Sequence, residues 1–251
     1  MARNKKKKMG AGTKIVLVLC LIVFCGSGYY LASYFMGAHQ SEKAFEELKD
    51  DKGGHDLAAL YQKNNDIVGW VTVKGTRIDY PVMQTKEQGD DPEFYLHRDF
   101  DKEYSDAGTP FMDAASDIYL PTWNWLIYGH HMKSGAMFHD LVEYESEDFF
   151  RKHPTFTMET LNGSGQGTYQ IIAACYSQIY PEDTDVFKYY EYPGYTDEDS
   201  FNTYVNGVKA LSIYDTGQTA AYGDQLVTLS TCAYQTEEGR FFIVGRWTGK
   251  Y

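Results

Sequence analysis

Cysteine is scarce in this sequence, with only four in 251 residues. Cys20 and Cys25 fall in an uncharged N-terminal run, which leaves Cys175 and Cys232 for the rest of the chain. A small exported domain that depends on disulfides normally carries more, so a disulfide framework is excluded, while a single Cys175–Cys232 bridge stays open. Cys175 ends the apolar run IIAAC and is expected to be an inert core thiol. Cys232 ends an apolar strand and is therefore the candidate for a reactive thiol.

Basic residues are also few outside the N-terminus. Residues 1–14 hold six Lys and Arg and no acidic residue, so the remainder carries 17 basic against 35 acidic side chains. A body this acidic repels polyphosphate, so we expect no nucleic-acid partner. The sequence also lacks a phosphate-binding loop and a metal-ligand cluster, and we therefore expect no cofactor and no metal.

Charge is absent altogether from Ile15 to Met36. A bilayer-spanning helix needs roughly 20 apolar residues, whereas the core of a signal peptide needs only about 7–15. We therefore predict a single-pass transmembrane signal-anchor over 15–36. The basic tail over 1–14 should stay cytoplasmic, with the rest of the chain outside the cell. A cleaved signal peptide is the alternative, and it too exports the body.

After the apolar run, 37–65 is predicted to be a helical connector and 66–251 one domain. The connector should hold a charged helix over 41–52 and a second helix capped by Asp56. Helices are also expected over 146–152 and after a capping box that starts at Thr196. Strand-like runs occupy 70–73, 78–82, 109–112, 125–128, 155–158, 169–176, 225–231 and 241–247. About eight short strands with a few helices indicate a mainly β (α+β) fold, a closed or nearly closed barrel.

Two stretches carry residue types that suit catalysis. TLSTCAYQTEEGR, over 228–240, joins two apolar runs and brings Cys232 and Arg240 to one end of a sheet. YGHHM, over 128–132, offers His130 as a base. A thiolate beside a base is a nucleophile, and a guanidinium can stabilise the oxyanion that forms when an amide is attacked. These residue types are sufficient in kind for acyl transfer through a thioester.

Other residues of the same types need an assignment. His131 is the alternative base, and it points to the opposite face from His130 if the strand continues that far. Arg246 lies on the strand of Arg240 but roughly 20 Å further along, where a solvated or edge role is expected. The remaining histidines are assigned to solvated or capping positions: His39, His55, His97, His139 and His153.

Taken together, these stretches resemble the sortases. LSTC followed eight residues later by Arg matches their catalytic signature, as does YGH. Further features resemble class B sortases in particular, and the resemblance covers about 66–247. They are VGW over 68–70, IDYPV over 78–82, YL over 95–96, AGTPF over 107–111, and the long helix before the Cys strand.

The resemblance implies an eight-stranded sortase-type barrel with N-terminal helices and a long inserted helix. It implies a membrane-anchored cysteine transpeptidase on the surface of a Gram-positive bacterium. Cys232 would be the nucleophile, His130 the acid/base and Arg240 the stabiliser of the substrate carbonyl oxygen. Its partners would be secreted proteins, cleaved after Thr of a C-terminal sorting motif through a thioacyl-enzyme and transferred to a peptidoglycan amine.

The resemblance also implies a substrate groove. Leu96, Tyr128, Ser230 and the backbone N–H of Ala233 match positions that line it, although core packing is an equal reading of Leu96 and Tyr128. Pro92 stands where some class B members have Asn, so the preferred sorting motif is not predicted. The acidic loop over 235–238 also differs among relatives and is expected to tune which charged substrate is accepted.

Two other classes remain open. A papain-like protease places its Cys before its His, whereas here His130 precedes Cys232, which disfavours it. A cysteine protease without transferase activity fits the same residues. A tyrosine-rich wall- or glycan-binding module with a structural Cys fits the composition. A thiol-reactive probe separates enzyme from module, because a catalytic Cys232 labels rapidly.

Overall fold

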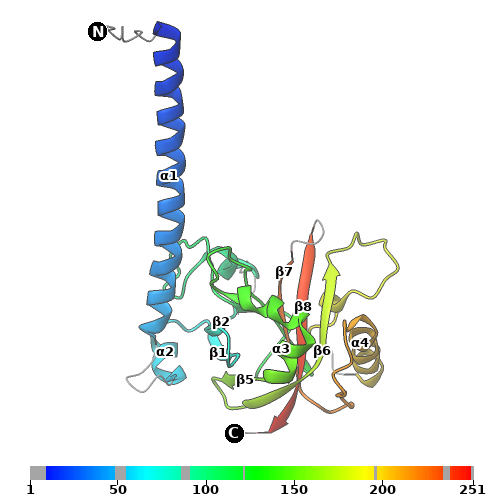
Figure 1. Cartoon of the computed structure of the whole chain (residues 1–251). Helices are drawn as coiled ribbons and strands as arrows, with labels where there is room; N and C mark the ends of the chain where they lie inside the picture. Colours follow the sequence, from blue (N-terminus) through cyan, green and yellow to red (C-terminus); the bar gives the residue numbers. More distant parts are fainter. Residues whose placement is uncertain are drawn as a thin grey trace, which may run out of the picture.

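The computed structural model describes residues 10–48, 55–85, 91–120, 122–194, 197–233 and 238–249. Eight strands close into a barrel in the order β1-β2-β3-β4-β7-β8-β6-β5 (Figure 1). The predicted mainly β barrel with helices is therefore confirmed. The elements are α1 Ala11–Glu46, α2 Leu57–Lys63, β1 Ile67–Thr72, β2 Asp79–Met83, η1 Phe94–His97, β3 Phe111–Met112, β4 Asn124–Tyr128, η2 Phe138–Glu145, α3 Glu147–Lys152, β5 Thr155–Thr160, β6 Gly167–Gln178, η3 Tyr189–Glu191, α4 Glu198–Leu211, β7 Leu226–Cys232 and β8 Gly239–Gly249.

Local capping sets where the short helices begin. The Asp56 carboxylate accepts from the Ala59 N–H at 3.0 Å and starts α2, as the sequence predicts. The expected capping box at the start of α4 is shifted by one residue. Asp197 is the cap, and it accepts from the Ser200 N–H at 2.8 Å, while Thr196 lies outside the described residues. An aspartate accepts this bond as well as threonine, so the first turn forms one residue later.

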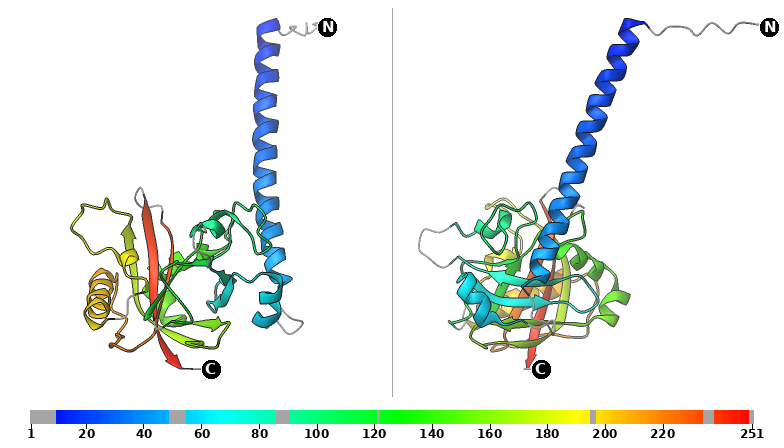
Figure 2. Two further views of the ribbon diagram at one scale, coloured as in Figure 1. Left: turned by 180° about the vertical axis from the view of Figure 1, so that it is seen from behind. Right: turned by 90° about the vertical axis from the view of Figure 1, so that its left-hand side faces the viewer.

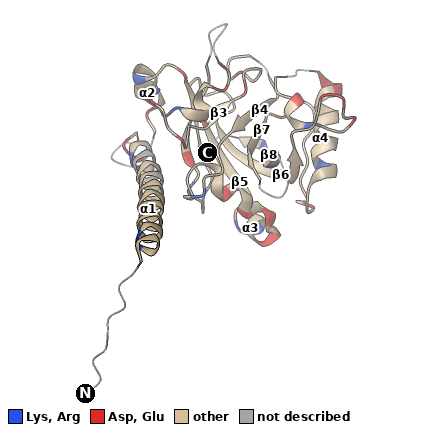
Figure 3. Ribbon diagram, turned by 90° about the horizontal axis from the view of Figure 1, so that it is seen from above, with Lys and Arg blue, Asp and Glu red and all other residues tan. Residues whose placement is uncertain are grey.

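The N-terminal helix is longer than the predicted span. α1 runs without a break from Ala11 to Glu46, so the charged segment from 41 continues the same helix. Ala11–Gly37 is long and apolar enough to cross a membrane, a property that anchors and signal sequences share. The helix extends away from the barrel (Figure 2), and most of its ribbon carries neither the blue of Lys and Arg nor the red of Asp and Glu (Figure 3). Residues 1–9 of the basic tail and 49–54 of the connector lie outside the described residues.

The other end of α1 packs on the barrel. The ring of Phe45 meets that of Tyr80 on β2 edge-on, with centroids 5.3 Å apart. Phe45 is only 3% exposed, so this contact is part of the hydrophobic core. The barrel end that holds the last residue of β7 points the same way as the N-terminal end of α1 (Figures 1 and 2).

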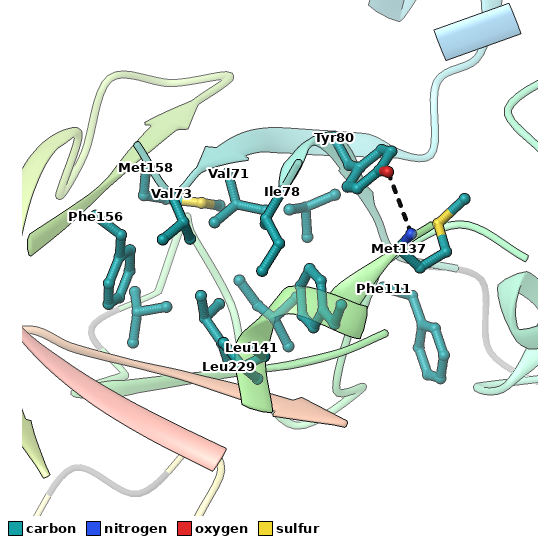
Figure 4. Close-up of a cluster of buried hydrophobic side chains, with 14 of the residues drawn as sticks. Val71, Val73, Ile78, Tyr80, Phe111, Met137, Leu141, Phe156, Met158 and Leu229 are labelled. Carbon is teal, nitrogen blue, oxygen red and sulfur yellow. Dashed lines mark hydrogen bonds between the residues drawn. The ribbon is translucent and has the colours of Figure 1, made fainter. Parts of the chain in front are cut away.

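Side chains of β7 alternate between two cores. Val227 and Leu229 fill the barrel interior, part of which Figure 4 shows. Leu226 belongs instead to a second cluster that the barrel forms with α4 and η3. Between this outer face and the helical layer, Tyr204 bonds Thr228 at 2.5 Å through their hydroxyls. Because the side-chain period of a strand is two, Cys232 lies on the same outer face.

Candidate active site

A cleft of about 650 Å³ opens on the outer face, where β4 and β7 end. Cys232, His130 and Arg240 all line it, together with Leu96, Tyr128 and Ser230 among the predicted groove residues. The other lining residues are Pro92, Glu93, Phe111, Asp113, Ala114, Gly129, Ile179, Tyr190, Thr231 and Glu238. The structure therefore brings together residues that are far apart in the sequence.

The two thiols of the barrel differ in access. Cys232 is half-buried in the cleft wall and pairs with Arg240 in the β7–β8 register. Cys175 is fully buried, and its thiol lies 3.3 Å from the Val208 carbonyl oxygen. Burial raises the pKa of the Cys175 thiol far above its ordinary value. Both thiols are free, so the alternative of a Cys175–Cys232 bridge is wrong.

His130 enters the cleft just beyond β4. Two hydrogen bonds hold the preceding glycine on β7: Gly129 N–H donates to the Ser230 carbonyl at 3.0 Å, and the Thr231 hydroxyl donates to the Gly129 carbonyl at 2.7 Å. A side chain at Gly129 would lie 2.6 Å from the Phe138 ring, so this position needs glycine. His130 therefore follows a segment whose path is fixed.

The ring of His130 is polarised by a backbone group. Its Nε2 lies 2.8 Å from the Leu96 carbonyl oxygen, and since a carbonyl only accepts, Nε2 carries the proton. In the neutral ring Nδ1 is then the acceptor. Burial lowers the pKa of His130, and the bond to Leu96 offsets part of this shift. The ring is therefore neutral at pH 7 and able to take a proton.

The guanidinium of Arg240 is held beside the cleft by its own turn. Nη1 donates to the carbonyl oxygens of Glu238 and Gly239, at 3.2 and 3.0 Å. Nη2 lies 3.5 Å from the Glu238 carboxylate, which is 66% exposed. An exposed ion pair of this kind contributes about 0–1 kcal/mol. Arg240 can exchange this pair for an oxygen bound in the cleft at little cost.

The predicted groove residues have different surroundings. The Tyr128 hydroxyl donates to Asp113 at 3.1 Å, and the Ser230 hydroxyl bonds that of Tyr189 at 2.6 Å. Burial raises the pKa of Tyr128 far above its usual range, so it remains a donor. Ala233 is not among the lining residues, and its N–H donates to the Gly239 carbonyl at 2.9 Å. That N–H is therefore not available to a ligand in this structure.

Sequence reasoning missed Asp113 and Tyr189. Each acts on a groove residue from a distant part of the chain, and no local pattern marks either one. His55 was assigned to solvent or a cap, and this was wrong. Its side chain is 8% exposed, stacks 4.0 Å from the Trp70 ring and bonds Glu159 at 2.7 Å. Its burial depends on β1 and β5, which lie next to each other only in the fold.

The other histidine and arginine lie elsewhere. His131 is not among the cleft-lining residues, and its Nδ1 lies 3.0 Å from the Cys232 carbonyl oxygen. Arg246 pairs across the sheet with Gln170 and Leu226, at the far end of β7 from Cys232. It is partly exposed and lies 3.8 Å from Asp224, in agreement with the solvated or edge role expected for it. Among the described residues, no group of three or more His, Cys, Asp or Glu is arranged to hold a metal ion.

Comparison with known proteins identifies the class. No family model matches the chain. Sortase B of Listeria monocytogenes is 38% identical over 200 residues, which cover 78% of this chain and 75% of that protein. Sortase B of Staphylococcus aureus is 26% identical over 245 residues, 93% and 94% of the two chains. The structure of sortase B from Bacillus anthracis superposes with a TM-score of 0.68 at 28% identity, over 86% of this chain and all of that one.

The barrel and these matches define a cysteine transpeptidase of the sortase type. Within that class, the chain belongs to the sortase B family. The resemblance found in the sequence motifs is thereby confirmed.

Proposed function

We propose that this enzyme cleaves a C-terminal sorting motif of secreted proteins after Thr and joins the new end to a peptidoglycan amine. Cys232 is the nucleophile, His130 the acid/base and Arg240 the group that stabilises the carbonyl oxygen. The observation that carries this proposal is the single cleft that all three line at the end of β7. Leu96, Tyr128 and Ser230 bind the peptide in the same cleft.

The reaction has two halves. In the first, Nδ1 of His130 takes the Cys232 proton and the thiolate attacks the Thr carbonyl. Arg240 then stabilises the oxyanion, and the imidazolium returns the proton to the departing amine. In the second half, the incoming amine attacks the thioester, gives a proton to His130 and releases the thiolate. The peptide bond lost in the first half is replaced by a new amide, and no cofactor is consumed.

The N-terminal segments determine where the enzyme is located. We assign 15–36 to a membrane anchor, 1–14 to the cytoplasm, 37–65 to the connector and 66–251 to the extracellular catalytic domain. The apolar length of Ala11–Gly37 and the basic residues before it support this topology. Substrates that are themselves exported meet the enzyme on the same side of the membrane.

A peptide panel tests the function directly. The soluble body, residues 41–251, is incubated with pentapeptides of the N/S-P-x-T-x type, with and without an added amine such as triglycine. We expect cleavage after Thr for some members and, with the amine, a ligated product identified by mass spectrometry. Cleavage with no ligated product at any amine concentration would point to a protease. No cleavage together with affinity for glycan would point to a wall-binding module.

The pH dependence of the reaction follows from His130. As the pH falls through its pKa, the ring becomes protonated and no longer accepts the thiol proton. Because burial lowers this pKa, the loss occurs at lower pH than for a free imidazole. The acidic limb of kcat/KM reports a base of the free enzyme. We expect its midpoint below the ordinary value of 6.5. A midpoint at or above that value contradicts the assignment of His130 as the base.

A further inference from the structure

The second histidine of YGHHM contacts the nucleophile's own backbone. His131 Nδ1 lies 3.0 Å from the carbonyl oxygen of Cys232. A carbonyl accepts only, so Nδ1 is the protonated nitrogen. It donates whether the ring is neutral or charged, and the bond therefore persists through any titration of His131.

Hydrogen bonds fix the backbone on both sides of Cys232. On its N-terminal side, the ladder between β7 and β8 holds the backbone, because Thr231 pairs with Phe241 and Cys232 with Arg240. On its C-terminal side, His131 holds the Cys232 carbonyl, and the next N–H, that of Ala233, donates to Gly239 at 2.9 Å. Fixing the peptide planes before and after a residue fixes its φ and ψ. The direction of the Cα–Cβ bond, and so the region that the thiol can reach, is fixed with them.

The segment that carries His131 is itself anchored. A bridge pairs His131 with Met137, and the Met137 N–H donates to the Tyr80 hydroxyl at 3.2 Å (Figure 4). His139 Nδ1 donates to the Met132 carbonyl at 2.7 Å, and its ring meets that of His131 edge-on, with centroids 4.7 Å apart. The imidazole is thus held from the barrel wall at β2 as well as from the loop.

We propose that His131 is a positioning residue, which orients the Cys232 thiol by donating from Nδ1 to the Cys232 carbonyl. This rests on the proposed role of Cys232 as nucleophile. The pairing of β7 with β4 ends at Ser230, so no residue of β4 pairs with Cys232. A side-chain donor replaces the strand partner that would otherwise hold it. The two adjacent histidines thus have different roles: His130 exchanges protons in the cleft, and His131 holds the backbone of Cys232.

Three variants separate this role from a general one. His131→Leu removes the donor at similar size, and His131→Asn keeps an N–H near the position of Nδ1. His139→Leu breaks the other loop bond but leaves the Cys232 carbonyl held. We expect His131→Leu to lower kcat about tenfold at unchanged KM and to slow alkylation of Cys232, because one partly buried hydrogen bond is lost. His131→Asn should recover most of both rates, and His139→Leu, which leaves the Nδ1 donor in place, should lose much less than His131→Leu.

The pH profile completes the test. The acidic limb should stay at its wild-type position in His131→Asn, because that limb belongs to His130. A limb that moves or vanishes in His131→Asn would make His131 itself the acid/base and overturn the proposal. Equal rates for the Leu and Asn variants, or a loss in His139→Leu as large as in His131→Leu, would also overturn it. Alkylation needs no peptide, so it is read even if the peptide panel shows no cleavage. Thermal melting of each variant confirms that it is folded.

Discussion

Replacing Cys232 by Ala is expected to abolish peptide cleavage, with kcat falling by more than about 10⁴-fold. The thiol is half-buried in the cleft wall, and no other thiol lines the cleft among the described residues. Without the sulfur no thioester forms, and the remaining groups only bind and polarise the peptide. The loss is measured as the rate of peptide cleavage. Intact-mass spectrometry should show an acyl adduct on the wild type during turnover and none on Cys232→Ala.

Cys175 supplies the matched control. It is the only other cysteine outside α1, and it is buried against α4 with its thiol at the Val208 carbonyl. Cys175→Ala should therefore keep both the acyl adduct and the cleavage rate. Iodoacetamide should label the wild type and Cys175→Ala alike. An adduct that persists in Cys232→Ala and disappears in Cys175→Ala would show that Cys175 is the acylated residue and would contradict the role of Cys232.

Removing the Arg240 guanidinium in Arg240→Ala is expected to lower kcat by about 10²–10³-fold, the usual effect of removing an oxyanion donor. In Arg240→Ala the oxygen of the attacked carbonyl loses a charged donor, while Cys232 and His130 are unchanged. Arg240→Lys keeps the charge but replaces five fixed donors by a single ammonium group, so we expect only partial recovery. The measurements are kcat and KM for a cleaved peptide, together with the alkylation rate of Cys232.

Arg246→Lys serves as the control for this series. It changes the same residue type on the same strand, at the end where Arg246 pairs with Asp224. Its kcat should stay within a factor of about two of wild type, as for most substitutions outside a site. If Arg240→Ala mainly raises KM and leaves kcat intact, Arg240 binds the peptide without stabilising the oxyanion.

Much of the barrel was predictable because its information is local. Most strands contain an apolar run between turns, and Asp56 caps α2 as its position indicates. The helix expected over 146–152 is α3. The more accessible of the two thiols was also identifiable, because Cys232 ends an apolar strand while Cys175 lies within one. These inferences need only the neighbours of each residue in the chain.

The remaining features depend on contacts between distant residues. The hydroxyl of Ser230 meets Tyr189, 41 residues away, only because β7 and η3 pack together. His131 reaches the Cys232 carbonyl across 101 residues. The start of α4 was misplaced for a different reason: Thr196 and Asp197 both suit a cap, and composition alone does not choose between them.

The unbroken course of α1 limits how far the barrel can lie from the apolar part of that helix. Phe45 is seated on Tyr80, and about eight helical residues separate it from Gly37, a rise of about 12 Å. If the apolar part of α1 spans the bilayer, the barrel stands on a short rigid stem close to the lipid surface. The end of the barrel at which β7 finishes points along α1 (Figure 1), so in that arrangement the cleft would face the lipid surface.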